Sequence, residues 1–437
     1  MVAYFPAVML SFDSARYARI DSMPLFGDFW MPAGYPLLLR FLHAISNHLW
    51  FTIAVQHAMG LSVGLMLFWV VRWLGVKPWV ACLPAGVAFL SGDHLYLEHM
   101  VMADCFFIFL TAAGLTAAVR GLIPEMNLWW ISLGSALLAG AALTRSVGIV
   151  LLPILVGCTV VWVRRLSGRA TAIAAAILPG LGVFGLYIGA FKITHGQYLG
   201  LSDMRGWNLY SRVAPFADCR KFHPPEGTDI LCEQRAPGDR PGPFGYVWDL
   251  NSAPRINFEL GPETGKKLAK FATQAILHQP GGYLRAVLSD LAKYVDPSIN
   301  PRPYGGQPRE ILSFGWRDAT VEQQVVQAMS RGYRGTAVHL HGQRTLGNYQ
   351  NLFRVGGLAI SILALFTVLG MVKAGGPLRL GVFLFGLSAF ALYIVPVLTV
   401  SYDFRYGIPP ETFIVVAGVL GTASLWPQLR ATTLPRR

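Results

Sequence analysis

The sequence predicts an all-α integral membrane protein, a bundle of about ten transmembrane helices with an additional segment of helices and loops on the outer side of the membrane. Three observations support this prediction. Of the 437 residues, 54% are hydrophobic and only 14% are charged, against about 25% charged residues in an ordinary soluble domain. Apolar stretches of about 20 residues, long enough to cross a bilayer, recur through most of the chain. The connections between these stretches are basic in alternation, as in proteins that cross a membrane repeatedly.

Ten apolar runs are expected to form the spans. They are 1–12, 50–72, 78–92, 102–119, 128–144, 147–163, 170–191, 352–372, 380–399 and 408–425. The first run makes a helix of only ~18 Å at ~1.5 Å per residue, which is too short to cross. We therefore expect a first span that begins upstream of Met1; the alternative is an N-terminus that is only half inserted.

Charge sets the expected orientation of the bundle. The basic connections hold Arg72 and Lys77, Arg120, Arg164, Arg165 and Arg169, Lys373 and Arg379, and finally Arg430, Arg436 and Arg437. The positive-inside rule puts these in the cytoplasm, so the connections 13–49, 93–101, 145–146, 192–351 and 400–407 face outward. The net charge of +13 fits contact with anionic lipid. It does not indicate nucleic acid as a partner, because the basic residues do not form one patch.

Three regions are expected along the chain. Residues 1–191 form an N-terminal transmembrane catalytic module, 192–351 an extracytoplasmic segment, and 352–437 the C-terminal transmembrane helices with a cytoplasmic tail. Within the extracytoplasmic segment, Cys219 and Cys232 face an oxidising compartment and are expected to form a disulfide.

Two stretches have the pattern of amphipathic helices. Residues 265–295 read as two short helices broken at Pro280, with Tyr283, Val287 and Leu291 on one face of the second. Residues 31–46 have the same character. Both stretches are expected to lie on the outer membrane surface.

Ionisable residues gather at the outward ends of the spans. They are Asp13, Arg16 and Tyr17 after the first run, Asp93, His94, Glu98, His99 and Asp104 in the second outward connection, Arg145 in the third, and Asp403, Arg405 and Tyr406 before the last run. A charged side chain at this depth in the membrane is energetically costly unless it forms an ion pair or takes part in the protein's function. Each group alone also fits a helix cap, a headgroup contact or an aromatic belt, and the second connection leaves open a divalent metal site. Their co-occurrence on one side favours an active site.

Five short motifs carry a resemblance to a known family. They are D-x-x-x-Y in the first outward connection, "PAGYP" after it, the acidic pair of the second connection, "ALTR" before the sixth run and "RYGIPP" before the last. In this order the set resembles the GT-C fold glycosyltransferases, in particular the protein mannosyltransferase-like and aminoarabinose transferase-like members of glycosyltransferase family 39. The likeness covers the chain from Ala3 to about Phe191 and the final spans, and matches the outer segment only loosely.

This resemblance implies a GT-C-like bundle and a reaction. A sugar on a polyprenyl-phosphate donor moves to an acceptor hydroxyl on the outer face, usually with inversion. The general base maps onto Asp13. The acids Glu98 and Asp104 help to hold the acceptor, the base or a divalent metal ion, and Arg145 and Arg405 bind the lipid phosphate. The chain departs from the commonest pattern at Ser14, where a second acid often follows the first, and this leaves Asp13 to act alone.

The residue types suit that chemistry. A phosphate leaving group needs cations rather than a general acid, and arginine grips phosphate oxygens in two places. One carboxylate within ~3 Å can take the proton of the attacking alcohol. On a helix, Arg16 and Tyr17 share the face of Asp13 at i+3 and i+4 and are expected to orient it. His99 and Tyr406 are expected to add substrate contacts.

The acceptor is expected to be a glycan, a lipid or a protein, and membrane lipids are the remaining partners. The expected location is the plasma (inner) membrane of a bacterium, with the site facing outward. The main alternative is a polytopic lipid or polysaccharide transporter or flippase. Such proteins usually carry internal repeats and midplane charges, and the sequence shows no repeat. A polymerase or ligase of lipid-linked oligosaccharides is a second alternative.

Overall fold

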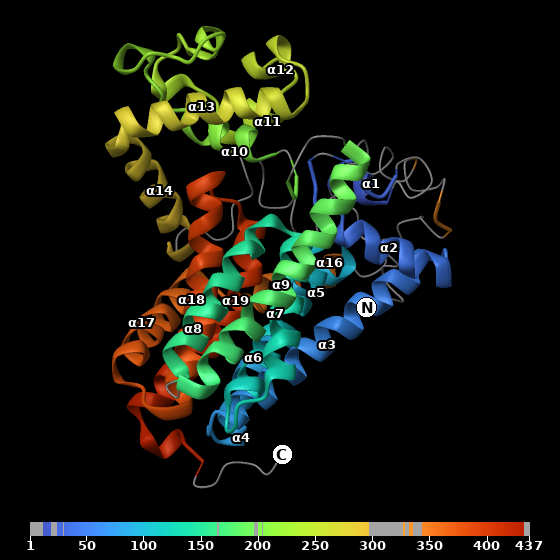
Figure 1. Ribbon diagram of the computed structural model, residues 1–437, viewed down its shortest axis with the longest axis vertical. Helices are drawn as coiled ribbons and strands as arrows, with labels where there is room; N and C mark the ends of the chain where they lie inside the picture. Colours follow the sequence, from blue (N-terminus) through green and yellow to red (C-terminus); the bar gives the residue numbers. More distant parts are fainter. Residues whose placement is uncertain are drawn as a thin grey trace.

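The fold is all-α within the part of the chain that the structure describes. The structure is a computed structural model that describes residues 12–18, 24–28, 30–163, 166–195, 200–202, 204–296, 327, 332–334 and 343–431. In these ranges every regular element is a helix, apart from two isolated β-bridges. Figure 1 shows a long helical bundle with a second layer of helices above one end. We call that layer, Met204–Val295, the cap.

The bundle consists of long apolar helices. Six helical stretches are long and apolar enough to cross a membrane: α3 (Leu49–Trp73), α6 (Ala103–Leu122), α9 (Leu166–His195), α16 with α17 (Gln343–Leu352 and Gly357–Lys373), α18 (Gly376–Thr399) and α19 (Phe404–Leu425). A bent pair, α4 (Pro78–Leu90) and α5 (Gly92–His99), makes up to a seventh span. The shorter apolar helices are α7 (Leu128–Thr144) and η1 with α8 (Ser146–Val150 and Leu151–Trp162). This is the architecture of a multi-pass membrane protein, as predicted. Residues 1–11 of the first predicted span lie outside the described ranges.

One predicted loop is a buried helix. The connection 93–101 folds largely as α5, which is bent by 45° from α4. Nearly every side chain of α5 is buried. Its first acid, Asp93, accepts hydrogen bonds from Gln350 at 2.8 Å and from Arg354 at 3.0 Å. The connection was predicted to face outward, and its helical form was not predicted, because these partners come from a part of the chain more than 250 residues away. Their hydrogen bonds compensate for the burial of the carboxylate.

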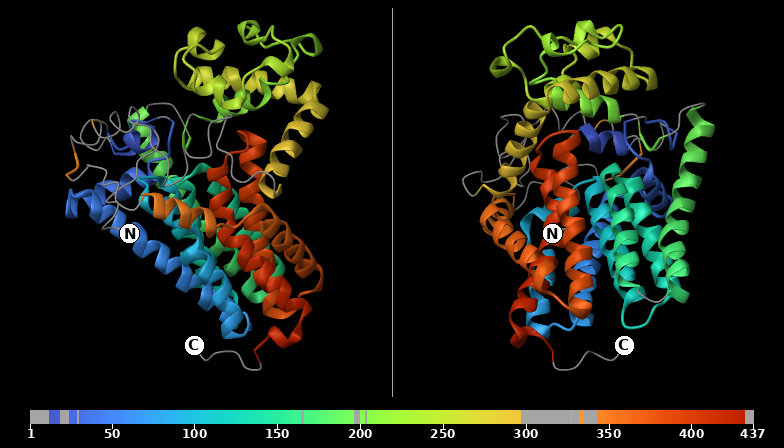
Figure 2. Two further views of the ribbon diagram at one scale, coloured as in Figure 1. Left: turned by 180° about the vertical axis from the view of Figure 1, so that it is seen from behind. Right: turned by 60° about the vertical axis from the view of Figure 1, so that its left-hand side comes forward.

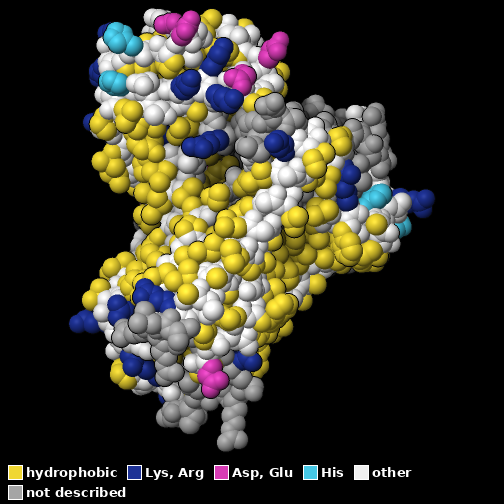
Figure 3. All heavy atoms as spheres, viewed as in Figure 1, with side chains coloured by type: hydrophobic (Ala, Val, Ile, Leu, Met, Phe, Trp, Pro, Cys, Tyr) yellow, Lys and Arg dark blue, Asp and Glu magenta, His cyan; other side chains and the backbone are white. Residues whose placement is uncertain are grey.

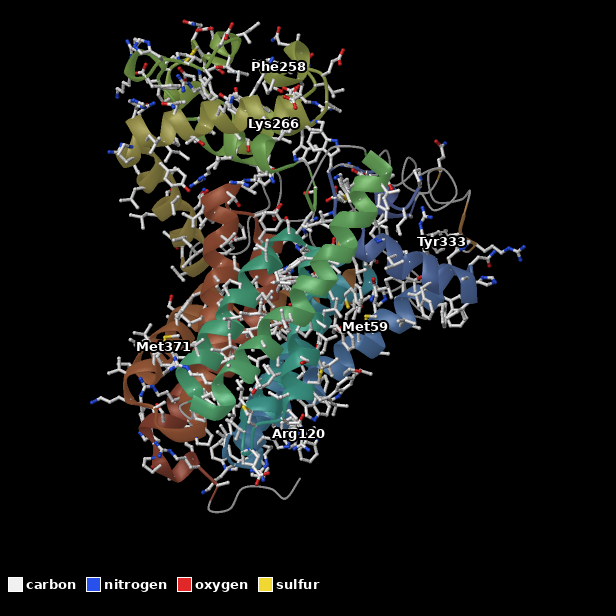
Figure 4. The ribbon with its side chains drawn as sticks, viewed as in Figure 1. Met59, Arg120, Phe258, Lys266, Tyr333 and Met371 are labelled. Atoms are coloured by element: carbon white, nitrogen blue, oxygen red, sulfur yellow. A yellow bond between two sulfur atoms is a disulfide. The ribbon has the colours of Figure 1, made fainter. Side chains whose placement is uncertain are left out.

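Basic connections meet at the end of the bundle opposite the cap. The Lys77 backbone N–H donates to Leu429 O at 3.0 Å, and Val76 forms a β-bridge with Arg430. The guanidinium of Arg120 lies 5.6 Å from the ring centre of Trp73. The two further views also show the cap at the end of the bundle opposite these basic connections (Figure 2). Figure 3 shows apolar side chains over much of the visible face of the bundle, with Lys and Arg at the end away from the cap and on the cap itself; Figure 4 labels Arg120 at that end.

Two short helices lie at the end of the bundle that carries the cap (Figure 1). They are α1 (Phe12–Tyr17) and α2 (Gly34–Ile45). Helix α2 exposes large apolar side chains at four-residue intervals, namely Leu37, Phe41 and Ile45, which suits a helix that lies at a lipid surface. Its first residue, Gly34, abuts the end of α7: a Cβ there would lie 2.4 Å from Leu143 O. Only glycine allows this approach, which brings α1 and α2 beside Arg145.

The cap has its own core. It contains α10 (Met204–Val213), α11 (Pro243–Trp248), α12 (Ala253–Asn257), α13 (Pro262–His278) and α14 (Pro280–Val295). Trp207, Tyr210 and Phe271 are buried at its centre. A disulfide joins Cys219 to Cys232. Figure 4 labels Phe258 and Lys266 within this layer.

Helix α14 connects the cap to the bundle. Val287 and Tyr294 are buried in the bundle core, and Tyr283 donates a hydrogen bond to Leu398 O at 2.8 Å. The face predicted to lie on lipid therefore packs against protein, while Leu284 and Leu288 are exposed. A sequence pattern shows that a helix has an apolar face but does not show what covers it.

Candidate active site

Asp13 is carried by α1, whose six residues are fixed by the helices around them. Tyr17 packs edge to face on Tyr35 of α2, with ring centres 5.0 Å apart. Ser14, the residue after Asp13, is fully buried. Burial raises the pKa of the Tyr17 phenol above its ordinary value, and the neighbouring Asp13 carboxylate adds to the rise. Tyr17 therefore stays protonated beside the carboxylate.

Asp104 and Arg145 form an ion pair between two helix ends. Asp104 lies in the first turn of α6, and Arg145 is the C-cap of α7. An acid at a helix start and a cation at a helix end both suit the helix dipole. Arg145 Nη1 donates a hydrogen bond to Asp104 Oδ1. The Asp104 side chain is only 1% exposed, so Arg145 supplies the charge that makes its burial tolerable.

Arg405 connects this pair to Asp13. It lies in the first turn of α19, after Asp403, whose carboxylate accepts the Arg405 backbone N–H at 2.9 Å. Arg405 Nη1 donates to Asp13 Oδ2 at 3.4 Å, and its Nε lies 3.8 Å from Asp104 Oδ1. Burial raises the pKa of the Asp403 carboxyl above its usual value. Four elements distant in the chain thus bring two carboxylates and two guanidinium groups together.

Tyr406 forms one wall of this cluster. The guanidinium of Arg145 lies 5.1 Å from the centre of its ring, and that of Arg405 lies 5.5 Å from it. Both distances are in the range of cation–π contacts. One aromatic ring therefore contacts both guanidinium groups, and it does so without neutralising their charge.

Solvent access differs between the two carboxylates. The Asp13 side chain is 25% exposed and that of Arg405 is 16% exposed, whereas Asp104 is buried. Among the described residues, Asp104 Oδ2 and Arg405 Nε are buried without a hydrogen-bond partner. Asp13 is therefore the more accessible of the two carboxylates, and Asp104 is buried next to both arginines. Unfilled hydrogen-bonding capacity in a buried ionic cluster is expected where a ligand completes the site.

Arg16 does not orient Asp13, contrary to the prediction. Its guanidinium pairs in two places with Asp28, at 2.8 and 2.5 Å. Asp28 also accepts the Trp30 backbone N–H at 2.8 Å. The i+3 spacing put Arg16 near Asp13 in sequence, but the acid in the following loop offers a bidentate partner, which is the geometry that arginine prefers. No pattern in the sequence indicated that the loop carrying Asp28 folds back onto α1.

Glu98 and His99 lie in a second cluster, away from the arginines. His57 of α3 contacts Glu98 Oε2 through Nδ1 at 2.5 Å and His99 Nδ1 through Nε2 at 3.0 Å. Gln56 donates to the carbonyl oxygens of Glu98 and Met100. No hydrogen bond or ion pair between described residues joins Glu98 to Asp13 or Arg145. Of the two predicted acids of the second connection, only Asp104 joins the cluster around Asp13.

The second cluster borders a small pocket of about 20 Å³. Glu98 and His94 line it, together with apolar side chains of α3, α4 and α6. Gly60 leaves room for the carboxylate: a Cβ there would lie 1.8 Å from Glu98 Oε1. The described ranges contain no group of three His, Cys, Asp or Glu side chains that could hold a metal ion.

No protein-family model matches the sequence, and no curated protein matches it. The solved structures that are similar to the chain include the following two. One is the archaeal oligosaccharyltransferase AglB from Archaeoglobus fulgidus, in complex with an inhibitory peptide and a dolichol-phosphate, at 10% identity and a TM-score of 0.44. The match covers 95% of this chain and 46% of AglB, so the chain spans about half of that protein.

The other is ArnT from Cupriavidus metallidurans bound to undecaprenyl phosphate, at 14% identity and a TM-score of 0.35. It covers 97% of this chain and 75% of ArnT. Both matches have a low sequence identity and a low TM-score. At these identities and TM-scores they assign no role to any residue of this chain.

Proposed function

We propose that the protein is a membrane glycosyltransferase that moves a sugar from a polyprenyl-phosphate donor to an acceptor hydroxyl on the extracytoplasmic face of the membrane. One observation carries the proposal: Asp13, Asp104, Arg145 and Arg405 converge from four separate elements at the end of the bundle opposite its basic connections. A lipid-linked sugar needs such a position, because its prenyl tail needs lipid and its sugar needs water.

Asp13 acts as the general base in this proposal. The acceptor oxygen attacks the anomeric carbon, its proton passes to Asp13, and the bond from that carbon to the phosphate oxygen breaks. The products are the glycosylated acceptor and polyprenyl phosphate. Because this is a single displacement, the configuration at the anomeric carbon inverts. No general acid is needed, since the phosphate leaves as a stable anion.

Arg145 and Arg405 hold the departing phosphate. Before the reaction, Arg405 contacts the carboxylates of both Asp13 and Asp104. When Asp13 takes the proton, it loses its charge and releases its hold on Arg405 while negative charge grows on the phosphate. The site therefore gains net positive charge at the moment when the leaving group requires it. Tyr406 keeps both guanidinium groups in place during this change.

The test is donor consumption by protein reconstituted in a bilayer. Undecaprenyl- and dolichyl-phosphate-linked hexoses and pentoses are supplied one at a time, and release of the free lipid phosphate is measured. We expect release for at least one donor and none for the Asp13→Asn variant. Asp239→Asn, at an exposed cap position, serves as the matched control. Lack of release for every donor by the wild-type protein would refute the proposal.

A lipid flippase is the second candidate, and one observation favours it. His57, Glu98 and His99 form a connected chain of ionisable side chains within helices of the membrane bundle, where such groups often serve transport. Movement of a labelled lipid-linked sugar across the same bilayer without bond cleavage would support the flippase. Cleavage that depends on Asp13 supports the transferase.

A further inference from the structure

An aromatic and cationic stack joins the cap to the segment that carries Asp13. Its centre is Trp30, in the loop after α1. From the cap, Trp207 and Trp248 approach with ring centres 5.4 and 5.7 Å from that of Trp30. The guanidinium of Arg16 lies 5.9 Å from the same ring centre, and that of Arg255 lies 5.6 Å from it. Three tryptophans and two arginines from five separate segments therefore meet in one place.

The members of this stack differ in exposure. Trp207 is 1% exposed and belongs to the cap core, whereas Trp248 is 46% exposed. Trp30 and Arg255 are half-buried. Packing between the cap and α1 accounts for the burial of Trp207 and of one side of Trp30. That packing leaves a large part of Trp248 open to solvent near the half-buried Arg255. Tryptophan is enriched where one side of a ring contacts protein and the other side contacts a partner.

The stack lies close to Asp13. Arg16 contacts Trp30, and Arg16 is three residues from Asp13 on α1. Residues three apart on a helix are neighbours, with Cβ atoms roughly 5–6 Å apart. A molecule that rests on Trp248 and Arg255 can therefore extend toward the carboxylate that receives the acceptor's proton.

We propose that Trp248, supported by Trp30 and Arg255, forms an acceptor subsite for a carbohydrate chain. A sugar ring has an apolar face of C–H groups and a rim of hydroxyls. The indole covers the apolar face, and the guanidinium donates hydrogen bonds to the hydroxyls. A peptide is normally recognised by a strand edge or an apolar groove, and the described residues contain no strand. This inference rests on the proposed function and specifies its acceptor class.

The variants separate ligand binding from folding. Trp248→Ala removes the exposed ring, and Trp248→Phe restores an aromatic surface at the same position. Leu250→Ala is the control, because Leu250 is an exposed apolar side chain two residues away.

The experiment measures binding of full-length protein in lipid nanodiscs to tetrasaccharides of arabinose, mannose and glucose, and to a serine- and threonine-rich peptide. We expect at least one tetrasaccharide to bind, Trp248→Ala to weaken its affinity at least about tenfold, and Trp248→Phe to recover part of the loss. Leu250→Ala should bind as the wild type does.

Absence of saccharide binding overturns the inference, and so does affinity that Trp248→Ala leaves unchanged or Trp248-dependent binding of the peptide alone. Failure of the proposed function has a different result. In that case the tetrasaccharide still binds through Trp248, but no polyprenyl-phosphate sugar is consumed, whether or not the tetrasaccharide is present.

Discussion

Arg405 Nη1 lies 3.4 Å from Asp13 Oδ2, although 392 residues separate the two in the chain. The contact joins the short helix at the start of the described chain to the first turn of the last long helix. It gives Asp13 a cationic neighbour while leaving the carboxylate partly exposed. The role proposed for Asp13 and the predictions below depend on this relationship.

Asp13→Asn should lower sugar transfer by roughly 10²–10⁴-fold, the usual contribution of a general base. The amide keeps the shape of the side chain but cannot accept the proton of the acceptor hydroxyl. Transfer is measured as release of polyprenyl phosphate, and expression and thermal unfolding should match the wild type. Wild-type turnover in this variant would remove Asp13 from the mechanism.

Arg145→Ala should destabilise the protein and weaken donor binding. It leaves the buried Asp104 carboxylate without its hydrogen-bonded cation, and breaking a buried pair in this way costs about 3–5 kcal/mol. The double variant Arg145→Ala/Asp104→Asn removes the stranded charge, so its unfolding temperature should recover while donor binding stays weak. A double variant no more stable than the single one would contradict the pairing.

Glu98→Gln should retain transfer within about tenfold of the wild type, because its contacts are with His57 rather than with Asp13 or the arginines. Asp104→Asn should lower the rate of sugar transfer by much more than tenfold. Comparing the two variants in the donor-release assay decides which acid of the second connection belongs to the site. Equal losses would favour the assignment of Glu98 as a catalytic residue.

Gly60→Ala should destabilise the bundle by about 1–3 kcal/mol, the usual cost of overpacking. The new methyl group would displace the Glu98 carboxylate, which lies 1.8 Å from the position of that Cβ. Gly86→Ala is the matched control, since a Cβ at Gly86 meets nothing within 4 Å. Thermal unfolding in detergent measures both, and equal unfolding temperatures would count against the close approach.

The Cys219→Ser/Cys232→Ser variant should lose about 3 kcal/mol of cap stability, as expected for a disulfide that closes a loop of this length. The two cysteines are 13 residues apart in the chain. Limited proteolysis should then cut the cap before the bundle. Resistance equal to that of the wild type would show that the bridge adds little to the stability of the cap.

Much of the bundle could be predicted because hydropathy reports directly on membrane helices. The helices α3, α6, α18 and α19 lie where the apolar runs are, and the basic connections meet at one end. Asp13, Asp104, Arg145, Arg405 and Tyr406 lie in one cluster, and each of them is at or near a helix end. A membrane fixes the depth of each span end, so residues at those ends share a level before any packing is known.

The directions of individual side chains could not be predicted. Helix α5 is buried on all sides, so no apolar stripe shows which neighbour Glu98 faces. The spacing in the sequence placed Arg16 near Asp13, but in the structure its guanidinium pairs in two places with Asp28. The stack around Trp30 joins segments that are far apart in the chain, and hydropathy carries no record of such contacts.

An experimental density map of the protein in a lipid bilayer with bound undecaprenyl phosphate tests the central claim most directly. We predict that the lipid phosphate lies within hydrogen-bonding distance of Arg145 and Arg405, with the Asp13 carboxylate beside it and open to water. A phosphate bound elsewhere, or an Asp13 side chain remote from Arg405, would contradict the account.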